Sequence, residues 1–244
     1  MLKETLLSSG NNDFMDNIFS SQEWSAATMV DPDEIRNHLY SLGLVGRKIK
    51  SLRFVGMDYA HSRDFIEDIA YHQLKQYEEE ERHRRSDYEN IDSGTVYKRY
   101  AEIDEPLLIQ FEDGDQFEID TPQEPEFRFS MNCIPWYIDE GTNLRNIDAN
   151  VLFSSCIGKT IWEAVVETYR TDKDPMFGME FDDGTGEREL ASWIVLKFHD
   201  GTCLKIGPHF DFCDVLLCNR DGQLEEFTFG EFKPGIFNQE DKLG

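Results

Sequence analysis

Basic residues are scarce in this sequence. Its 244 residues include 24 Lys and Arg against 49 Asp and Glu, which gives a formal net charge of −25 at pH 7. A surface this acidic repels phosphate backbones and anionic lipid headgroups, so we expect no nucleic-acid partner and no membrane partner. A basic protein or a cation is favoured instead, although acidity by itself can serve only to keep a protein soluble.

Cysteine pairs with metal-binding spacing are also missing. The five cysteines, an odd number, include no C-x-x-C pair. Scattered thiols of this kind are typical of a reducing compartment rather than of a disulfide framework. The sequence starts without an apolar run of signal-peptide length and has no stretch of about 18 apolar residues, so we expect a soluble cytoplasmic protein.

Motifs that specify catalysis or cofactor binding are equally scarce. The sequence has no G-x-S-x-G, and Gly158-Lys159-Thr160 lacks the first glycine of a phosphate-binding loop. We therefore expect no cofactor and no catalysis. Catalytic groups can also converge from distant segments, which leaves a divergent enzyme as an alternative.

Two β-hairpin patterns dominate what the sequence does contain. Residues 192–206 alternate apolar and polar side chains on both sides of Asp200-Gly201, and residues 106–119 do so around Asp113-Gly114. An Asp-Gly pair tolerates the positive φ that a tight turn requires. The sequence therefore predicts two antiparallel hairpins.

Matching features before each hairpin indicate a repeat. Gly46 precedes a strand pattern that starts at Ile49, and Gly158 stands in the same relation to Ile161. We interpret this as an internal duplication. Each unit is expected to contain a helix, a glycine turn, a strand, a connection, a hairpin and a further strand. The predicted fold is α+β, with helices packed on a mixed or antiparallel sheet.

The repeat divides the chain into an arm at residues 1–30, a first unit at 31–140 and a second unit at 141–244. Large apolar side chains in the arm predict that it packs on the body. The first unit opens with Asp31-Pro32, a capping residue and a first-turn proline that predict a helix. A charged helix is predicted as an insertion at 63–90, where apolar residues recur at helical spacing.

One stretch after the second hairpin carries the side chains of a metal site. His209, Asp211 and Cys213 alternate with phenylalanines, so on a strand all three face one side. Imidazole, carboxylate and thiolate together are zinc ligands. The same alternation is what any half-buried strand shows, so a purely structural role is the competing interpretation.

An acidic loop precedes the second hairpin. It contains Glu180, Asp182, Asp183 and Glu187, without the spacing of a calcium-binding loop. A solvated loop is the simpler interpretation. Because this loop interrupts the repeat, the four acids are candidates for contact with a partner.

The repeated order of glycine turn, strand, connection and Asp-Gly hairpin occurs in residues 44–55 with 107–119, and again in 156–166 with 194–206. This order resembles many small acidic bacterial proteins of unassigned function, some of which are similar to immunity proteins encoded beside polymorphic toxins. The resemblance implies an acidic inhibitor that is steered electrostatically to a basic toxin. The resemblance assigns no functional residue to this sequence.

We therefore expect a non-catalytic, acidic protein-binding protein, with immunity-type inhibition of a basic partner as its most specific form. The alternative is a divergent enzyme or a metal-binding protein that uses the region from His199 to Cys213.

Overall fold

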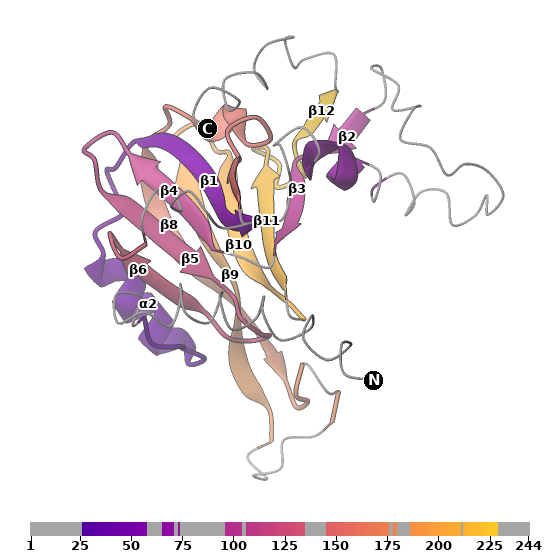
Figure 1. The fold of residues 1–244 in the computed structure, drawn as a ribbon. Coiled ribbons are helices and arrows are strands. Elements are labelled where there is room, and N and C mark those ends of the chain that lie inside the picture. Colours follow the sequence, from indigo (N-terminus) through magenta and orange to yellow (C-terminus); the bar gives the residue numbers. More distant parts are fainter. Residues whose placement is uncertain are drawn as a thin grey trace, which may run out of the picture.

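A computed structural model describes part of the 244-residue chain (Figure 1). All strand pairs within the described ranges are antiparallel, and helices are few. The predicted α+β class is confirmed at this level. The ranges are 26–57, 65–70, 73, 96–103, 106–134, 145–175, 178–179, 186–210 and 212–228.

Two five-stranded sheets form the body. The first has the order β6-β5-β4-β1-β7 and the second the order β3-β11-β10-β9-β8. The strands of the first sheet are β1 (Ile49–Met57), β4 (Leu107–Phe111), β5 (Gln116–Asp120), β6 (Arg128–Met131) and β7 (Arg145–Asp148). Those of the second are β3 (Tyr100–Ile103), β8 (Ile161–Thr171), β9 (Arg188–Phe198), β10 (Cys203–His209) and β11 (Phe212–Cys218).

The two sheets exchange one strand each. Strands β1, β4, β5 and β6 are successive neighbours, as are β8, β9, β10 and β11. Strand β7 precedes the second set in the chain but pairs with β1, and β3 precedes β4 but pairs with β11. A small third sheet joins β2 (Val96–Lys98) to β12 (Glu226–Thr228).

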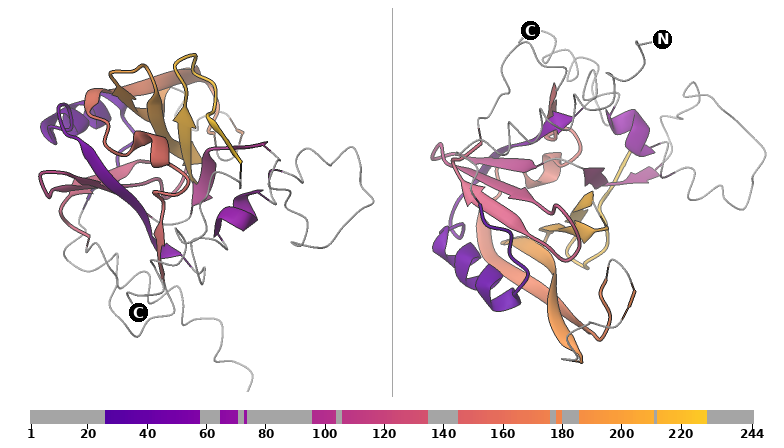
Figure 2. Two further views of the ribbon diagram at one scale, coloured as in Figure 1. Left: turned by 90° about the horizontal axis from the view of Figure 1, so that it is seen from above. Right: turned by 60° about the horizontal axis from the view of Figure 1, so that its bottom comes forward.

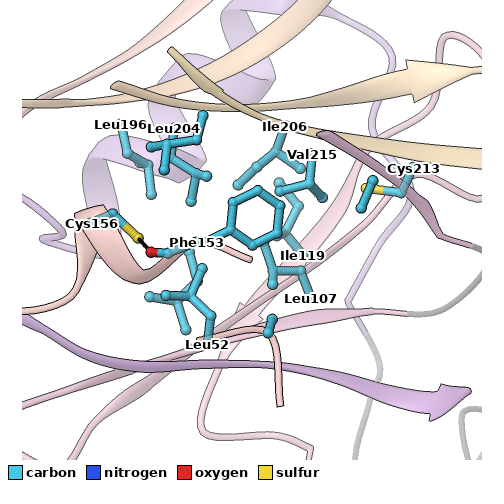
Figure 3. Close-up of a cluster of buried hydrophobic side chains, with 14 of the residues drawn as sticks. Leu52, Leu107, Ile119, Phe153, Cys156, Leu196, Leu204, Ile206, Cys213 and Val215 are labelled. Carbon is cyan, nitrogen blue, oxygen red and sulfur yellow. Dashed lines mark hydrogen bonds between the residues drawn. The ribbon is translucent and has the colours of Figure 1, made fainter. Parts of the chain in front are cut away.

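The main apolar core lies between the sheets. Figure 3 shows Leu52 and Ile119 of the first sheet facing Leu204 and Ile206 of the second, with Phe153 between them. All five side chains are completely buried. Both halves of the chain therefore contribute to the same core rather than to two separate ones.

The predicted helix at Asp31-Pro32 is confirmed as α2 (Pro32–Ser41). The Asp31 carboxylate caps it by accepting hydrogen bonds from two backbone N–H groups at 2.9 and 3.0 Å. The helix buries Ile35 and Leu39 and contacts β8 and β9 (Figure 2). It therefore covers one side of the core.

The described residues of the second half contain no helix equivalent to α2, so that part of the repeat prediction is wrong. The matching segment forms β7 and a short 3₁₀ turn, η2 (Ser154–Cys156). The Asp148 carboxylate accepts a hydrogen bond from the Asn150 N–H at 2.8 Å, and short polar side chains of this kind compete with the backbone hydrogen bonds of a helix. The open edge of β1 offers this segment a strand partner instead.

Positions that the predicted repeat matches contact each other reciprocally. The Gly46 N–H donates to the Ile161 carbonyl at 2.8 Å, and the Gly158 N–H donates to the Ile49 carbonyl at 2.8 Å. Both glycines have positive φ, 89° and 79°. The backbones of β1 and β8 therefore enter their sheets from matching turns that are hydrogen-bonded to each other.

The two Asp-Gly hairpins are confirmed and have the same geometry. Gly114 and Gly201 have φ values of 97° and 88°. The last residue of the first strand, Phe111 or Phe198, donates its N–H to a carbonyl four residues later, at 2.8 and 2.9 Å. Glycine at the left-handed position of a three-residue loop explains the Asp-Gly pattern.

A basic side chain packs on each hairpin in the same way. The Arg47 guanidinium lies 5.4 Å from the centre of the Phe111 ring and 3.2 Å from the Asp113 carboxylate. In the second half, Lys159 Nζ lies 5.5 Å from the Phe198 ring centre and 2.8 Å from the Asp200 carboxylate. Each hairpin aspartate thus forms an ion pair with the basic residue that directly follows Gly46 or Gly158.

Other sequence predictions fall partly or wholly outside the described residues. These are most of the arm at 1–30, most of the helix at 63–90 and the unit boundary at 140. Residues 65–70 and 73 are helical, and Met29 pairs with Phe127 beside β6. The described part of the arm therefore packs on the first sheet.

Gly207 allows the Trp193 indole to approach the β10 backbone closely, which generates a first prediction. A Cβ atom there would lie 2.7 Å from the indole and in collision with the Ser192 carbonyl oxygen. We expect Gly207→Ala to lower the free energy of unfolding by about 1–3 kcal/mol, measured by urea denaturation. Unchanged stability would show that β9 and β10 are not packed this closely.

Candidate functional site

The chain reverses direction between His209 and Phe212. These residues pair across the β10–β11 turn, and Phe210 between them has a φ of 56°. The expectation that His209, Asp211 and Cys213 share one strand face is therefore wrong. An alternating pattern of this length does not distinguish one strand from two strands joined by a two-residue turn. Asp211 itself lies outside the described residues.

Cys213 points into the core. Its side chain is 1% exposed, and burial raises the pKa of its thiol well above the ordinary value. Figure 3 shows it beside the apolar side chains of the second sheet. Cys213 is therefore placed as a packing residue, away from the side of β10 on which His209 lies.

His209 instead meets two carboxylates from neighbouring strands. Its Nδ1 lies 3.2 Å from Glu102 Oε1 on β3 and 3.7 Å from Asp214 Oδ2 on β11. Among the described residues, this is the one group of three potential metal-ligating side chains whose donor atoms lie within 4.8 Å of one another. The His209 and Glu102 side chains are about half exposed, whereas that of Asp214 is 12% exposed.

Asp214 is the electrostatic centre of this group. Burial is the main cause that raises its pKa to about 6, and the charges of Glu102 and Glu124 act in the same direction. His209 and a hydrogen bond from the Tyr100 hydroxyl, 3.1 Å long, oppose the shift. Burial, Glu102 and Asp214 also raise the pKa of Tyr100.

A third carboxylate reaches the turn from the loop after β5. Glu124 Oε2 accepts a hydrogen bond from the Phe210 N–H at 3.4 Å, and the Glu124 N–H donates to the Phe210 carbonyl at 2.7 Å. The Tyr169 hydroxyl donates to Glu124 Oε1 at 3.4 Å. Burial, followed by the charge of Glu124, raises the pKa of Tyr169 to about 12. The first sheet is thus connected to the turn.

Two aromatic rings are exposed among these acids. Phe210 is 53% and Phe212 36% exposed, and the Phe210 ring centre lies 4.9 Å from that of His209. Carboxylates next to an open aromatic face are suited to a guanidinium or ammonium group. We call this surface the turn site. It comprises Glu102, Glu124, His209, Phe210, Phe212 and Asp214.

The remaining residues of the His199 to Cys213 region do not join the turn site. The Asp200 carboxylate binds Lys159 and Thr202, which lowers its pKa to about 2. The His199 ring lies 5.8 Å from that of Trp162 at the other end of β10. Cys203 pairs in register with Cys218.

Of the acidic-loop candidates, only Glu187 lies within the described residues. It is exposed, and its carboxylate lies 3.8 Å from the Arg170 guanidinium. Glu180, Asp182 and Asp183 lie outside the described residues. A role of this loop in partner binding stays a prediction.

A buried carboxylate in the first sheet is explained by its hydrogen bonds. Glu118 is completely buried and accepts from the Gln116 amide at 2.7 Å, from the Cys133 N–H at 2.8 Å and from the Ser130 hydroxyl. These donors satisfy a carboxylate without a basic partner. We therefore interpret Glu118 as structural.

A hollow of about 960 Å³ lies between α2 and β6. Its lining includes Met29, His38, Phe129 and Met131. Most of its wall is apolar, and the side chains of the turn site are not part of it. It is therefore a surface depression separate from the turn site.

Comparison of the chain with protein-family profiles, with curated proteins and with solved structures gave no match. In the described part of the chain, no helix combines the length and apolar character needed to cross a membrane.

Sequence reasoning missed Glu102, Glu124 and Asp214. Asp214 left one signal, because it is a single acid inside the otherwise apolar stretch of β11. A charged residue in such a position is seldom buried without a purpose in the fold or the function. Glu102 and Glu124 gave no comparable signal among so many acids.

The raised pKa of Asp214 predicts how stability depends on pH. An unfolded aspartate has a pKa of about 3.9, so this group favours the folded state below about pH 4, and that contribution is lost as the pH rises through about 6. Asparagine keeps an acceptor for Tyr100 but does not titrate. We expect Asp214→Asn to raise Tm relative to the unmodified protein at pH 7 more than at pH 4, measured by thermal denaturation. A difference that does not change with pH would contradict this assignment.

Proposed function

We propose that the chain is a non-catalytic binding protein that associates with a basic protein partner through the turn site. Its most specific form is an immunity-type inhibitor that covers a functional surface of a basic toxin. The proposal is supported by three carboxylates and two exposed aromatic rings gathered at one turn.

The internal ion pairs support an outward negative field. Many described bases are already neutralised by acids of the same chain, so the excess of acids sets the sign of the remaining surface charge. The pairs include Arg36–Glu189, Arg47–Asp115, Lys48–Glu112, Lys98–Glu226, Arg99–Glu225, Lys159–Asp200, Arg170–Glu187, Lys197–Glu163 and Lys205–Glu167.

The backbone of Phe210 is the observation that favours function at this turn most strongly. Phe210 and Asn132 are the two non-glycine residues with positive φ among the described residues, and asparagine tolerates that conformation. A bulky residue at φ 56° costs about 1–3 kcal/mol. A strained and exposed aromatic ring is better explained by recognition than by stability.

Replacing Phe210 separates these two effects. We expect Phe210→Gly to raise the free energy of unfolding by about 1 kcal/mol, because glycine adopts positive φ without strain. The same substitution should weaken binding of a fluorescent oligo-arginine peptide about 5-fold, because an exposed cation–π contact contributes about 1 kcal/mol. Fluorescence anisotropy and urea denaturation measure the two quantities.

Trp162→Ala is the matched control, since Trp162 has the same exposed fraction, 53%, on a different strand end. It should leave peptide affinity unchanged, and the affinity of the unmodified protein should fall as salt is raised. Unchanged affinity in both variants would show that the peptide senses only overall charge, and equal losses would show that it contacts any exposed aromatic ring. Either result would overturn the proposed turn site.

A metal-binding function is the second candidate, favoured by the positions of three donor atoms. A tetrahedral ion with bonds of about 2.0–2.1 Å holds its ligands about 3.3 Å apart. The distances from His209 Nδ1 to Glu102 and Asp214, 3.2 and 3.7 Å, are close to this spacing. The ligands are thus Glu102, His209 and Asp214, rather than the set that the sequence indicated.

Cobalt titration tests this second candidate. We expect Co²⁺ to give a visible absorption band and a stoichiometry of one ion, both lost in His209→Gln. His199→Gln, which changes an exposed histidine elsewhere, should bind normally. Retention of the band in His209→Gln would mean that the ion is adventitious. His209→Gln keeps the carboxylates and Phe210, so it separates this candidate from binding of a basic partner.

We also infer that residues 31–140 and 141–244 derive from one duplicated unit. The reciprocal hydrogen bonds of Gly46 and Gly158 and the equivalent Arg47 and Lys159 contacts support this inference. A reducing, cytoplasmic location likewise stays a proposal, supported by the five free cysteines.

A further inference from the structure

We propose that Cys203 and Cys218 form an oxidation site, in which a peroxide converts the two thiols into a reversible disulfide between β10 and β11. This inference does not depend on the proposed partner. It rests on the register of two adjacent strands and on the environment of the two sulfur atoms.

Strand register places the two cysteines directly opposite each other. Cys203 pairs with Cys218 in an antiparallel ladder that continues through Leu204 and Leu217. Directly opposed residues have Cα atoms about 4.5 or 5.5 Å apart, and disulfides span about 4.4–6.8 Å. The bond therefore requires rotation of the side chains and no separation of the strands.

The two thiols already contact each other. A hydrogen bond between them is the largest cause that lowers the pKa of Cys203, and the charges of Lys205 and Lys197 act in the same direction. The same contact raises the pKa of Cys218. Cys203 is the more exposed of the two, at 9% against 3%, so we assign it as the thiol that reacts first and Cys218 as the thiol that then closes the disulfide.

The pair lies at the margin of a small apolar cluster. Cys203, Cys218 and Val195 pack with Trp193 and Leu224, apart from the main core. Cys203 is 9% exposed and begins β10 directly after the exposed Asp200-Gly201 turn. A small peroxide therefore has a short path to Cys203.

The chemistry balances with hydrogen peroxide as the oxidant. The Cys203 thiolate attacks one peroxide oxygen, the O–O bond breaks, and the products are a sulfenic acid and a hydroxide ion. The Cys218 sulfur then attacks the Cys203 sulfur and displaces the hydroxyl group, which leaves as water with the Cys218 proton. The proton that Cys203 released when it ionised neutralises the hydroxide of the first step. Two thiols and one peroxide thus yield one disulfide and two waters.

The other described cysteines lack this arrangement and serve as internal controls. Burial raises the pKa of Cys156 to about 12, and its S–H donates to the Phe153 carbonyl at 3.0 Å. Cys213 is buried in the main core, and Cys133 donates to the Met131 carbonyl at 3.4 Å. None of the three has a second thiol in register.

Peroxide treatment of the folded full-length chain tests the proposal. We expect loss of two hydrogen atoms by intact mass, a Cys203–Cys218 cross-link by non-reducing peptide mapping, and a Tm several degrees higher that dithiothreitol reverses. In Cys218→Ala, Cys203 should be recovered as sulfenic or sulfinic acid, whereas Cys156→Ala should still form the cross-link.

Three results would overturn the inference. They are a mass unchanged at peroxide concentrations that oxidise free cysteine, oxidation of Cys156 or Cys213 at the same rate as Cys203, and a map that shows sulfinic acid without the cross-link. The map of the unmodified protein decides the question even if a variant fails to fold.

Discussion

Exchange of edge strands between the two halves is the constraint on which the turn site depends. Strand β3 belongs by sequence to the first half but completes the second sheet beside β11. Its register sets Glu102 directly opposite Asp214, and the next strand, β10, supplies His209. Without β3, Asp214 would lie on an open edge, and the carboxylates would not converge.

That arrangement works against the stability of the fold. Like charges directly opposite each other on a sheet are destabilising, and Asp214 is also largely buried. The strained Phe210 backbone adds a second cost at the same place. The two hairpins differ from the turn site in this respect, because Arg47 and Lys159 each pair a base with a hairpin acid. The turn site therefore lowers the stability of the folded chain locally, whereas the surrounding surface pairs its charges. Such a loss of stability is typical of functional sites, where side chains are left free for a partner.

Local patterns in the sequence were sufficient for the local elements. The cap at Asp31, the two Asp-Gly turns and the alternating residues of β1 predicted α2, both hairpins and one strand correctly. Long-range pairing was beyond such patterns, because nothing in Tyr100–Ile103 specifies β11 as its partner. The turn at Phe210 was not predicted from the sequence, for another reason. It has no glycine or asparagine at the position of positive φ, so turn chemistry gave no signal there.

The most direct test of the turn site is a titration of the isotopically labelled protein with oligo-arginine peptide, followed through backbone amide resonances. Binding at the turn site predicts that the largest shifts occur at Phe210, Phe212 and Asp214, with a smaller effect at Glu102 across the strand pair. Shifts spread evenly over the acidic surface, or concentrated at the Asp113 and Asp200 hairpins, would contradict the account.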